Sequence, residues 1–306
     1  MASAAAAESA ARRVTDGRPA VLVTGAARGI GEACALRLAR DGFRVYAGVR
    51  READGQALIG HGGPAIVPVM LDVTDAAQIA ALAARIDVES GERGLQALVN
   101  NAGIAVAGPL EFLPIDELRR QLEINFIGQL AVTQACLPLL RRSRAGAHAD
   151  HRCGRIVFMS SISGRHALPF TGAYAASKYA LEAAADALRV ELLPFGLRVT
   201  LVEPGMVATP IWDASVAAAD RMLQRAPPQL TEFYGAALAG VRRRAARGTR
   251  AAPPERVADA VSHALTARRP RIRYVVGRDA RARLALQKVL PAGVRDRLIA
   301  RLIERL

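Results

Sequence analysis

The sequence has little of what marks membrane-spanning, secreted or metal-binding proteins. No apolar run reaches the roughly 18 to 20 residues that a transmembrane helix needs. The three cysteines, Cys34, Cys136 and Cys153, are odd in number and far apart, without the spacing of a metal site. Residues 1–18 are rich in alanine and lack the apolar segment of a signal peptide. We therefore expect a reduced, cytoplasmic protein that binds no metal and has a flexible tail over residues 1–18.

Acidic residues are fewer than basic ones, 28 against 42, so the formal net charge is +14. A chain this basic raises the possibility of nucleic-acid binding. The basic residues are spread among loops and the last third of the chain, however, and aromatic residues do not alternate with them. We expect no nucleic-acid partner, and instead an attraction to anionic substrates, cofactor phosphates or anionic lipid surfaces.

Short apolar runs alternate with amphipathic segments along most of the 306 residues. This alternation predicts an α/β fold, a doubly wound parallel sheet with helices on both faces. The expected strands are 20–24, 43–49, 65–71, 95–99, 156–158, 197–202 and 274–276. Two of the expected helices end at about residues 40 and 193. The others span 76–88, 116–140, 211–250, 254–267 and the chain from 279 onward. We expect a single domain over residues 19–278 with a helical lid at about 205–250, followed by a helical extension over 279–306.

The first expected strand is followed by a turn rich in glycine, with Gly25, Gly29 and Gly31 leading into a helix. Glycines let the backbone approach a ligand closely, and a helix N-terminus offers free N–H groups and positive dipole to phosphate. The spacing differs from the commonest dinucleotide fingerprint. The turn predicts a phosphate-binding site, and an ordinary glycine turn remains the alternative.

The second strand ends where an acid usually binds the ribose of NAD, but Val49 is followed by Arg50 instead. Arg28 lies inside the glycine turn. Two arginines at these places favour a 2′-phosphate and hence NADP(H). Glu52 and Asp54 lie close by in the sequence and keep NAD(H) as the alternative.

The fourth strand runs directly into the turn Asn100-Asn101-Ala102-Gly103. Since ligands bind at the carboxyl ends of the strands in such sheets, this turn either borders a cleft or is a plain turn. Farther along, Asn125 lies within an expected helix, where an amide is unfavourable unless it has a partner.

The segment from Arg155 to Lys178 carries the clearest chemical pattern. Tyr174 and Lys178 are four residues apart and thus on one helix face. An ammonium beside a phenol favours the phenolate, so we predict that Lys178 lowers the pKa of Tyr174, as a general acid/base requires. Ser160 and Ser161 follow the preceding strand. Taken alone, the spacing is more often that of an ordinary helix surface.

Together, these motifs resemble the short-chain dehydrogenase/reductase family over roughly residues 19–274. The matching segments are Thr24-Gly25-Ala26-Ala27-Arg28-Gly29-Ile30-Gly31, Asn100-Asn101-Ala102-Gly103, Asn125, Ser161, Tyr174, Lys178 and Pro204-Gly205. The resemblance implies a Rossmann-type fold that binds a nicotinamide cofactor. It selects Ser161 over Ser160 and leaves Tyr179 as a packing residue.

The resemblance also implies what each residue does. Tyr174 transfers the hydroxyl proton, Lys178 lowers its pKa and binds the nicotinamide ribose, Ser161 holds the substrate oxygen, and Asn125 fixes a water between Lys178 and solvent. The implied cofactor contacts are Gly25, Ala27, Arg28, Gly29, Ile30, Gly31, Arg50, Asp72, Val73, Asn100, Ala102, Gly103, Tyr174, Lys178, Pro204, Gly205, Val207 and Thr209. Members of the family usually form dimers or tetramers, so a homodimer or homotetramer is expected.

Within the family, residues 45–50 and 274–281 look like the branch that acts on steroids, retinoids and other lipophilic alcohols and ketones. We therefore predict an NADP(H)-dependent oxidoreductase that interconverts an alcohol and its ketone or aldehyde. The alternatives are a cofactor-binding regulator without turnover, and an epimerase or dehydratase on the same scaffold.

The last residues form an amphipathic helix with an apolar stripe, Val294, Leu298, Leu302, Ile303 and Leu306, and arginines elsewhere around it. Such a stripe either packs on the domain or a partner subunit, or contacts a membrane surface. The lid, with Trp212, Phe233 and Tyr234, is expected to shape an apolar substrate pocket.

Overall fold

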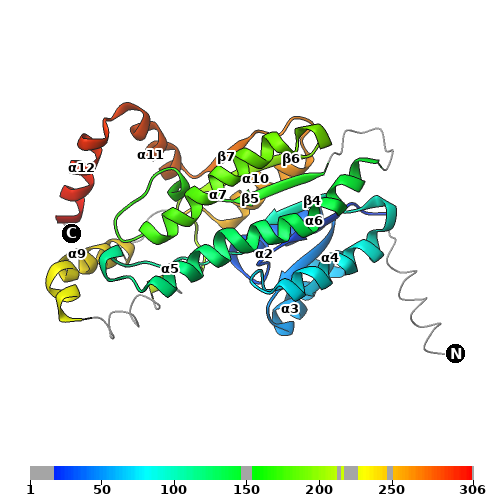
Figure 1. The fold of residues 1–306 in the computed structure, drawn as a ribbon, viewed down its shortest axis with the longest axis horizontal. Coiled ribbons are helices and arrows are strands. Elements are labelled where there is room, and N and C mark those ends of the chain that lie inside the picture. The colour runs from blue at the N-terminus through cyan, green and yellow to red at the C-terminus, as the bar shows by residue number, and fades with distance from the viewer. Residues whose placement is uncertain (1–16, 146–153, 212–214, 217–226, 247–250, 305–306) are drawn as a thin grey trace.

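The computed structural model describes residues 17–145, 154–211, 215–216, 227–246 and 251–304 (Figure 1). Its centre is a sheet of seven strands in the order β3-β2-β1-β4-β5-β6-β7, in which every neighbouring pair is parallel. The strands are β1 Ala20–Val23, β2 Arg44–Val49, β3 Ile66–Met70, β4 Ala97–Asn100, β5 Arg155–Met159, β6 Arg198–Pro204 and β7 Arg273–Val276. The predicted doubly wound parallel sheet is confirmed, and its strand order reverses between β1 and β4.

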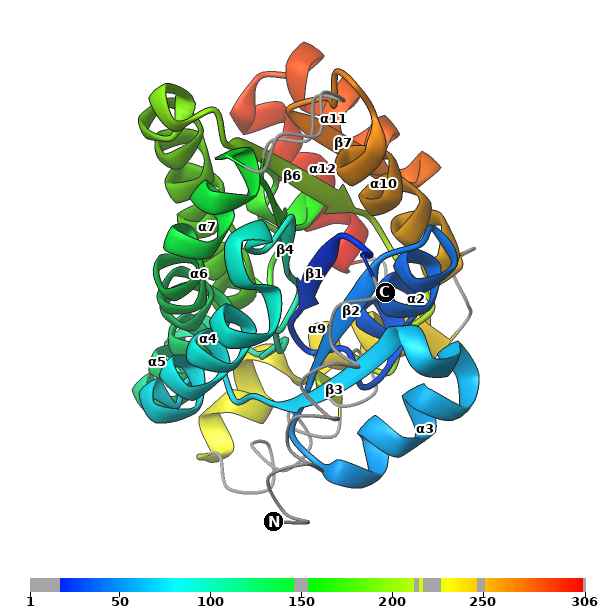
Figure 2. The same cartoon turned by 90° about the vertical axis from the view of Figure 1, so that its right-hand side faces the viewer.

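Helices cover both faces of this sheet (Figure 2). The α-helices are α2 Gly29–Arg40, α3 Glu52–Gly62, α4 Ala76–Ser90, α5 Ile115–Leu122, α6 Gly128–Ala145, α7 Gly172–Glu191, α9 Pro228–Ala246, α10 Pro254–Thr266, α11 Arg278–Val289 and α12 Ala292–Glu304. Helices α2, α3 and α10 lie on one face and α4 to α7 on the other. Sequence patterning did not identify α3, whose apolar residues are few and weakly periodic.

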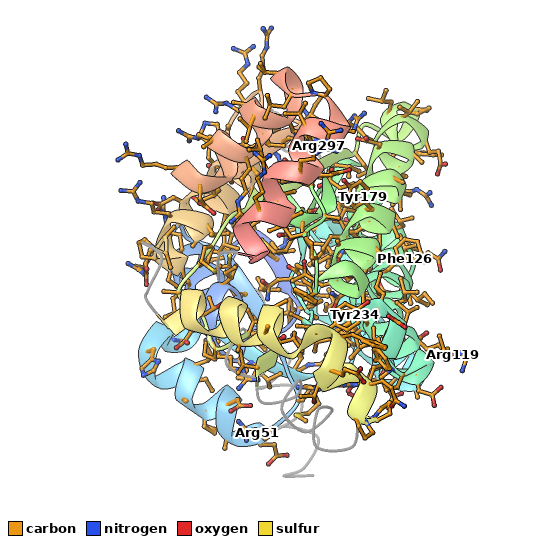
Figure 3. The ribbon with its side chains drawn as sticks, turned by 90° about the vertical axis from the view of Figure 1, so that its left-hand side faces the viewer. Arg51, Arg119, Phe126, Tyr179, Tyr234 and Arg297 are labelled. Atoms are coloured by element: carbon orange, nitrogen blue, oxygen red, sulfur yellow. The ribbon has the colours of Figure 1, made fainter. Side chains whose placement is uncertain are left out.

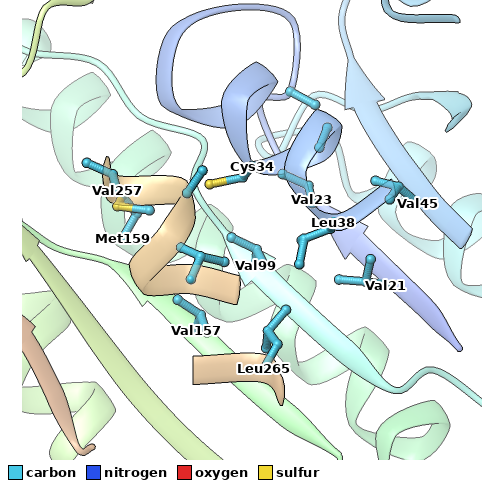
Figure 4. Packing of buried hydrophobic residues seen from close by; sticks show 14 of the residues in the cluster. Val21, Val23, Cys34, Leu38, Val45, Val99, Val157, Met159, Val257 and Leu265 are labelled. Atoms are coloured by element: carbon cyan, nitrogen blue, oxygen red, sulfur yellow. The ribbon is translucent and has the colours of Figure 1, made fainter. Parts of the chain in front are cut away.

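Alternation along the strands divides the core between the two faces. In β1, Val21 and Val23 belong to one buried cluster, whereas Ala20 and Leu22 belong to the other, because successive side chains point to opposite faces. Figure 4 shows the first cluster, where α2 and α10 pack on the central strands. Cys34 contributes to this cluster as a small apolar side chain, and burial raises the pKa of its thiol to about 12.

The helix predicted over 116–140 is not continuous. A π-helical turn, Glu123–Ile127, separates α5 from α6 and contains the fully buried Asn125. In this turn Asn125 is hydrogen-bonded to the backbone of Ile104. The spacing of apolar residues in the sequence predicts a regular helix and gives no sign of the π turn. Gly128, at the start of α6, lies so close to the Val73 carbonyl that an added Cβ would be 2.5 Å from its oxygen.

Strand β6 is longer than predicted. The Glu203-Pro204 pair was expected to end the strand, yet these two residues still pair with Val275 and Val276 of β7. The strand therefore delivers Pro204 to the carboxyl edge of the sheet.

The chain ends in two helices, α11 and α12; α11 follows β7 and contacts it, and α12 lies beside α9 (Figure 1). Residues 1–16 of the predicted tail, and 212–214, 217–226 and 247–250 of the predicted lid, lie outside the described residues, as does Trp212. Within the described part of the chain, no helix has both the length and the apolar character to cross a membrane.

Candidate active site

The glycine turn joins β1 to α2 at the carboxyl edge of the sheet. Gly25 and Gly29 have φ angles of +63° and +60°, which favour glycine. Gly31 packs so tightly that an added Cβ would be 2.1 Å from the Gly25 carbonyl oxygen. Arg28 is the N-cap of α2, and its side chain makes no capping hydrogen bond. The first N–H groups of the helix therefore remain available to an anionic ligand, and the turn fits a dinucleotide phosphate.

The Asn100–Gly103 turn is hydrogen-bonded to the glycine turn. Thr24 Oγ1 accepts from the backbone N–H groups of Asn101 and Ala102, both at 2.9 Å. Asn101 Nδ2 donates to the carbonyl oxygens of Thr24 and Gly25 at 3.0 and 3.1 Å. The two motifs, about 75 residues apart in sequence, thus form one surface.

Asn100 does not present its side chain to this surface. It is fully buried, and Nδ2 donates to Thr133 Oγ1 of α6 at 2.7 Å. A ribose could reach only the backbone of Asn100.

The segment after β6 lies against the glycine turn at the carboxyl edge of the sheet. An added Cβ on Gly29 would lie 3.2 Å from Thr209 Cγ2, so Thr209 lies directly beside the glycine turn. Val207 is buried. The Met206 N–H donates to Asp279 Oδ2 at 2.9 Å, and this bond fixes the segment to the start of α11.

Helix α7 carries Tyr174 and Lys178 on its buried face, 7% and 3% exposed. The helix is rich in alanine, a strong helix former, and its buried stripe continues through Leu181 to Glu182 and Ala185. Lys178 Nζ donates to the Met159 carbonyl oxygen at 2.7 Å and lies 5.8 Å from the centroid of the Tyr174 ring. Tyr179, by contrast, is 44% exposed on the outside of α7, so it is not the packing residue that the sequence predicted (Figure 3).

The titration of the pair differs from the sequence-based prediction. Burial raises the pKa of Tyr174 to about 12, and a hydrogen bond with Ser161 only partly opposes this. Burial also lowers the pKa of Lys178 to about 8, against the opposing charge of Glu182. The predicted lowering of the Tyr174 pKa is wrong for this arrangement, because burial disfavours the charged phenolate.

Of the two serines after β5, Ser161 is the one that meets Tyr174. Its Oγ accepts from the Ser163 N–H at 3.1 Å and lies 3.5 Å from the Pro204 carbonyl oxygen. Ser160 Oγ instead lies beside Glu182, since both would contact a Cβ added to Gly164. The family spacing and the geometry agree on Ser161.

Asn125 lies under the same edge. Its Oδ1 accepts from the Ile104 N–H at 2.8 Å, and its Nδ2 donates to the Ile104 carbonyl and to Ser177 Oγ at 2.9 and 3.1 Å. Gly103 packs on it, because an added Cβ would be 3.2 Å from Asn125 Oδ1. Both ends of the amide are therefore occupied by protein groups.

Charged residues surround the outer end of β2. Arg28 and Arg50 are exposed, and neither guanidinium forms a hydrogen bond or salt bridge with another residue of the described ranges. Arg51 holds Asp54 through two hydrogen bonds of 2.9 and 2.7 Å, which lower the pKa of Asp54. Asp72 follows β3; partial burial raises its pKa, but hydrogen bonds from Thr74 outweigh this and lower it overall.

Sequence reasoning missed an aromatic cluster above this edge. Tyr234 of α9 meets Phe112 and Phe170 edge to face, with centroid distances of 6.0 and 6.1 Å. Tyr234 also donates to Glu111 at 2.7 Å. Phe170 has a φ of +65°, a conformation that costs about 1 kcal/mol or more for a side chain of this size. Three segments far apart in the sequence supply these rings, so no local pattern could have grouped them.

Among the residues with described positions, no three histidine, cysteine, aspartate or glutamate side chains group in a way that could hold a metal ion.

A family model described as short chain dehydrogenase matches residues 19–220. Retinol dehydrogenase 5 of Mus musculus is 35% identical over 294 residues, covering 93% of this chain and 89% of the relative. Human 17-beta-hydroxysteroid dehydrogenase type 6 is 36% identical over 289 residues, covering 92% of this chain and 87% of the relative.

The fold agrees with these matches. A short chain dehydrogenase from Burkholderia cenocepacia, solved in complex with NADP, superposes with a TM-score of 0.66 at 28% identity, covering 93% of this chain and 97% of that one. The predicted family and the predicted similarity to the retinoid and steroid branch are confirmed. This chain belongs to the short-chain dehydrogenase family and is an oxidoreductase enzyme.

Proposed function

We propose that the protein is an NADP(H)-dependent oxidoreductase that interconverts a lipophilic alcohol and its ketone or aldehyde. The observation that carries this proposal is the convergence of Ser161, Tyr174 and Lys178 with the glycine turn at one edge of the sheet. These residues come from β5, α7 and the β1–α2 connection, and they lie where open parallel sheets bind ligands.

A nicotinamide ring bound at this edge supplies or accepts the hydride. Tyr174 donates the proton to the carbonyl oxygen during reduction and removes it from the hydroxyl during oxidation. Ser161, hydrogen-bonded to Tyr174, holds the same oxygen next to the phenol. Lys178 presents its ammonium to the phenol and to a ribose. Because both ends of the Asn125 amide are occupied, its backbone is the part that would hold a water between Lys178 and solvent.

The cofactor would lie along the two hydrogen-bonded turns. The phosphates would meet the N-terminus of α2, the adenine would contact Asp72 and Val73, and the adjacent ribose would contact the backbone of Asn100. The remaining proposed contacts are Gly25, Ala27, Gly29, Ile30, Gly31, Ala102, Gly103, Pro204, Gly205, Val207 and Thr209.

The preference for NADP(H) rests on Arg28 and Arg50. Both are exposed at the outer end of the glycine turn, as a 2′-phosphate requires. Of the two acids that keep NAD(H) as the alternative, Asp54 is held by Arg51 and is thus less available to a ribose hydroxyl, whereas Glu52 is exposed. A related structure that contains NADP supports the same assignment.

The lipophilic substrate rests on the aromatic cluster of Phe112, Phe170 and Tyr234. These rings lie on the connections that follow the carboxyl ends of β4, β5 and β6, so they cover the edge that carries Tyr174. Relatives with similar sequences are named retinol and hydroxysteroid dehydrogenases. Apolar walls with few polar groups are typical of sites for such ligands.

A panel of ketones, aldehydes and alcohols of increasing size, followed at the NADPH absorbance, tests this function. We expect stoichiometric oxidation of NADPH with product formation, and higher kcat/KM for the larger apolar carbonyl compounds. A product formed without net NADPH consumption would indicate an epimerase or dehydratase. Tight cofactor binding without turnover on any member of the panel would indicate a regulator.

We further propose that residues 19–278 form the catalytic domain, with a lid at about 205–250, in a cytoplasmic homodimer or homotetramer. The extension over 279–306 is proposed to touch membrane surfaces peripherally. Its described part leaves Leu286, Val289, Val294 and Leu298 between 42% and 78% exposed. The arginines around them would attract anionic headgroups.

A further inference from the structure

A cluster of buried charges lies directly behind Lys178. Glu182 is one helical turn beyond Lys178 on the buried face of α7, and its side chain is 9% exposed. Arg273 of β7 donates from Nε to Glu182 Oε2 at 3.2 Å. Glu203 of β6, whose side chain is fully buried, lies 3.0 Å from Arg273 Nε and accepts from Arg165 at 3.1 Å.

The acids of this cluster share their arginine partners. Arg165 and Arg273 both lie against Glu203, and Arg273 also binds Glu182 and Asp186. Asp186 is the outermost acid, with a side chain that is 42% exposed and also bound by Arg189. Glu182 is thus the buried acid nearest in sequence to Lys178 on the shared face.

The hydrogen bond that Lys178 makes does not neutralise it. Nζ donates to the Met159 carbonyl, a neutral dipole, and on the buried face of α7 Tyr174 lies one turn before Lys178 and Glu182 one turn after it. A buried ammonium is costly unless an opposite charge compensates for its lost hydration. Burial lowers the pKa of Lys178 and the charge of Glu182 opposes that change, which agrees with the geometry.

We propose that Glu182 is a positioning residue that supplies the buried counter-charge of Lys178, and that Arg273, Glu203 and Arg165 hold it in place. Glu182 touches neither substrate nor cofactor in this role. It keeps Lys178 protonated next to Tyr174, so the proton-transfer site depends on strands β6 and β7 as well as on α7.

The composition of the chain allows a direct test. Lys178 and Lys288 are its only lysines, and Lys288 is exposed on α11. In a Lys288→Arg background, protein labelled with [ε-13C]lysine gives one lysine signal, whose titration by NMR reports Lys178 alone without cofactor or substrate. We expect Glu182→Gln to raise the acid dissociation constant of Lys178 about tenfold, as loss of a close opposite charge does.

Two variants make the result specific. Asp186→Asn removes another acid bound to Arg273, one turn farther from Lys178, and should leave the titration within about threefold of the parent. Glu182→Asp keeps the charge and should also stay within about threefold. An unchanged titration in Glu182→Gln, or an equal shift in Asp186→Asn, would overturn the proposal. If Glu182→Gln does not fold, the double variant Glu182→Gln/Arg273→Met is compared with the single variant Arg273→Met. This pair differs only in the charge of residue 182 and leaves no arginine without its partner. Equal titrations of Lys178 in the two variants would also overturn the proposal.

The kinetic consequence rests on the proposed function. Ketone reduction needs the protonated pair, so its rate falls as pH rises, and in Glu182→Gln this fall should begin at lower pH. A shifted lysine titration in a protein without oxidoreductase turnover would refute the proposed function and leave the role of Glu182 intact. A shifted kinetic profile with an unshifted lysine titration would refute the role of Glu182.

Discussion

Helices α7 and α12 are both amphipathic, but the apolar stripe of α7 is buried and that of α12 is partly exposed. The stripe of α7 is buried and includes the polar Tyr174, Lys178 and Glu182. The described part of α12 leaves Val294 and Leu298 43% and 42% exposed. In α7, the sheet and its loops cover the stripe and change the protonation chemistry of what lies on it. Periodicity marks a face in each helix, but only the packing neighbours decide whether that face becomes a core, a site or a surface.

The largest effect should separate the two faces of α7. Tyr174→Phe removes the proton donor and should lower kcat by about 10²- to 10⁴-fold while the protein stays folded. Tyr179→Phe, the same change five residues later on the exposed face, should leave kcat within about twofold. Turnover of a responsive substrate measures both. Undiminished turnover in Tyr174→Phe would show that α7 does not carry the proton transfer.

A second test compares a buried lysine with an exposed one. The pKa of Lys178 is lowered to about 8 from an ordinary value of 10.5, so between these values the unfolded chain holds more protons than the native state. The free energy of unfolding of the parent, relative to Lys178→Met, should therefore rise with pH from about 8 to 10.5, by at most about 3 kcal/mol.

Lys288→Met provides the matched control, because Lys288 is exposed on α11 and its stability difference should not change over that pH range. Denaturant unfolding between pH 7 and 11 measures each difference. A flat or falling difference for Lys178→Met would mean that burial does not lower its pKa.

A third test compares exposed arginines at the proposed cofactor site with an exposed arginine on α12. Arg28→Ala and Arg50→Ala should each weaken NADPH binding about tenfold and leave NADH binding nearly unchanged, since each removes one charge-assisted phosphate contact. Arg297→Ala removes an exposed charge on α12 (Figure 3) and should change neither affinity. Fluorescence titration with the two cofactors decides this. Equal affinities of the parent for NADPH and NADH would refute the NADP(H) preference.

The smallest effect is expected on α12 itself. Val294→Ser/Leu298→Ser should reduce binding to vesicles that contain anionic phosphatidylserine about threefold, because two exposed apolar side chains are lost. Val88→Ser, on α4 and 85% exposed, is the control. Sedimentation with vesicles measures binding, and size-exclusion chromatography shows whether the same change instead alters a dimer or tetramer. Unchanged results in both would leave the exposed stripe without the proposed partner.

Much of the fold could be predicted from the sequence, and the proposed catalytic residues Ser161, Tyr174 and Lys178 follow the strand and lie on the helix where the sequence placed them. Features that depend on near neighbours were found this way: the glycines of the β1–α2 turn, the tyrosine and lysine one turn apart, and the apolar run of β1. Where the outcome depended on distant neighbours, prediction failed. The π turn around Asn125 depends on Ile104, and the strand length of β6 depends on β7.

The sequence by itself determined the alternation of strands and helices, the placing of Tyr174 and Lys178 on one helix face, and the turn that can accept a phosphate. These follow from local spacing, since a helix or a strand fixes which side chains share a face. Tertiary structure alone decided that Arg273 of β7 pairs with Glu182 of α7 and Glu203 of β6, that burial raises rather than lowers the pKa of Tyr174, and that three separate segments bring aromatic rings together. Hydration and long-range charge depend on what surrounds a group in space, and that is set only when the chain has folded.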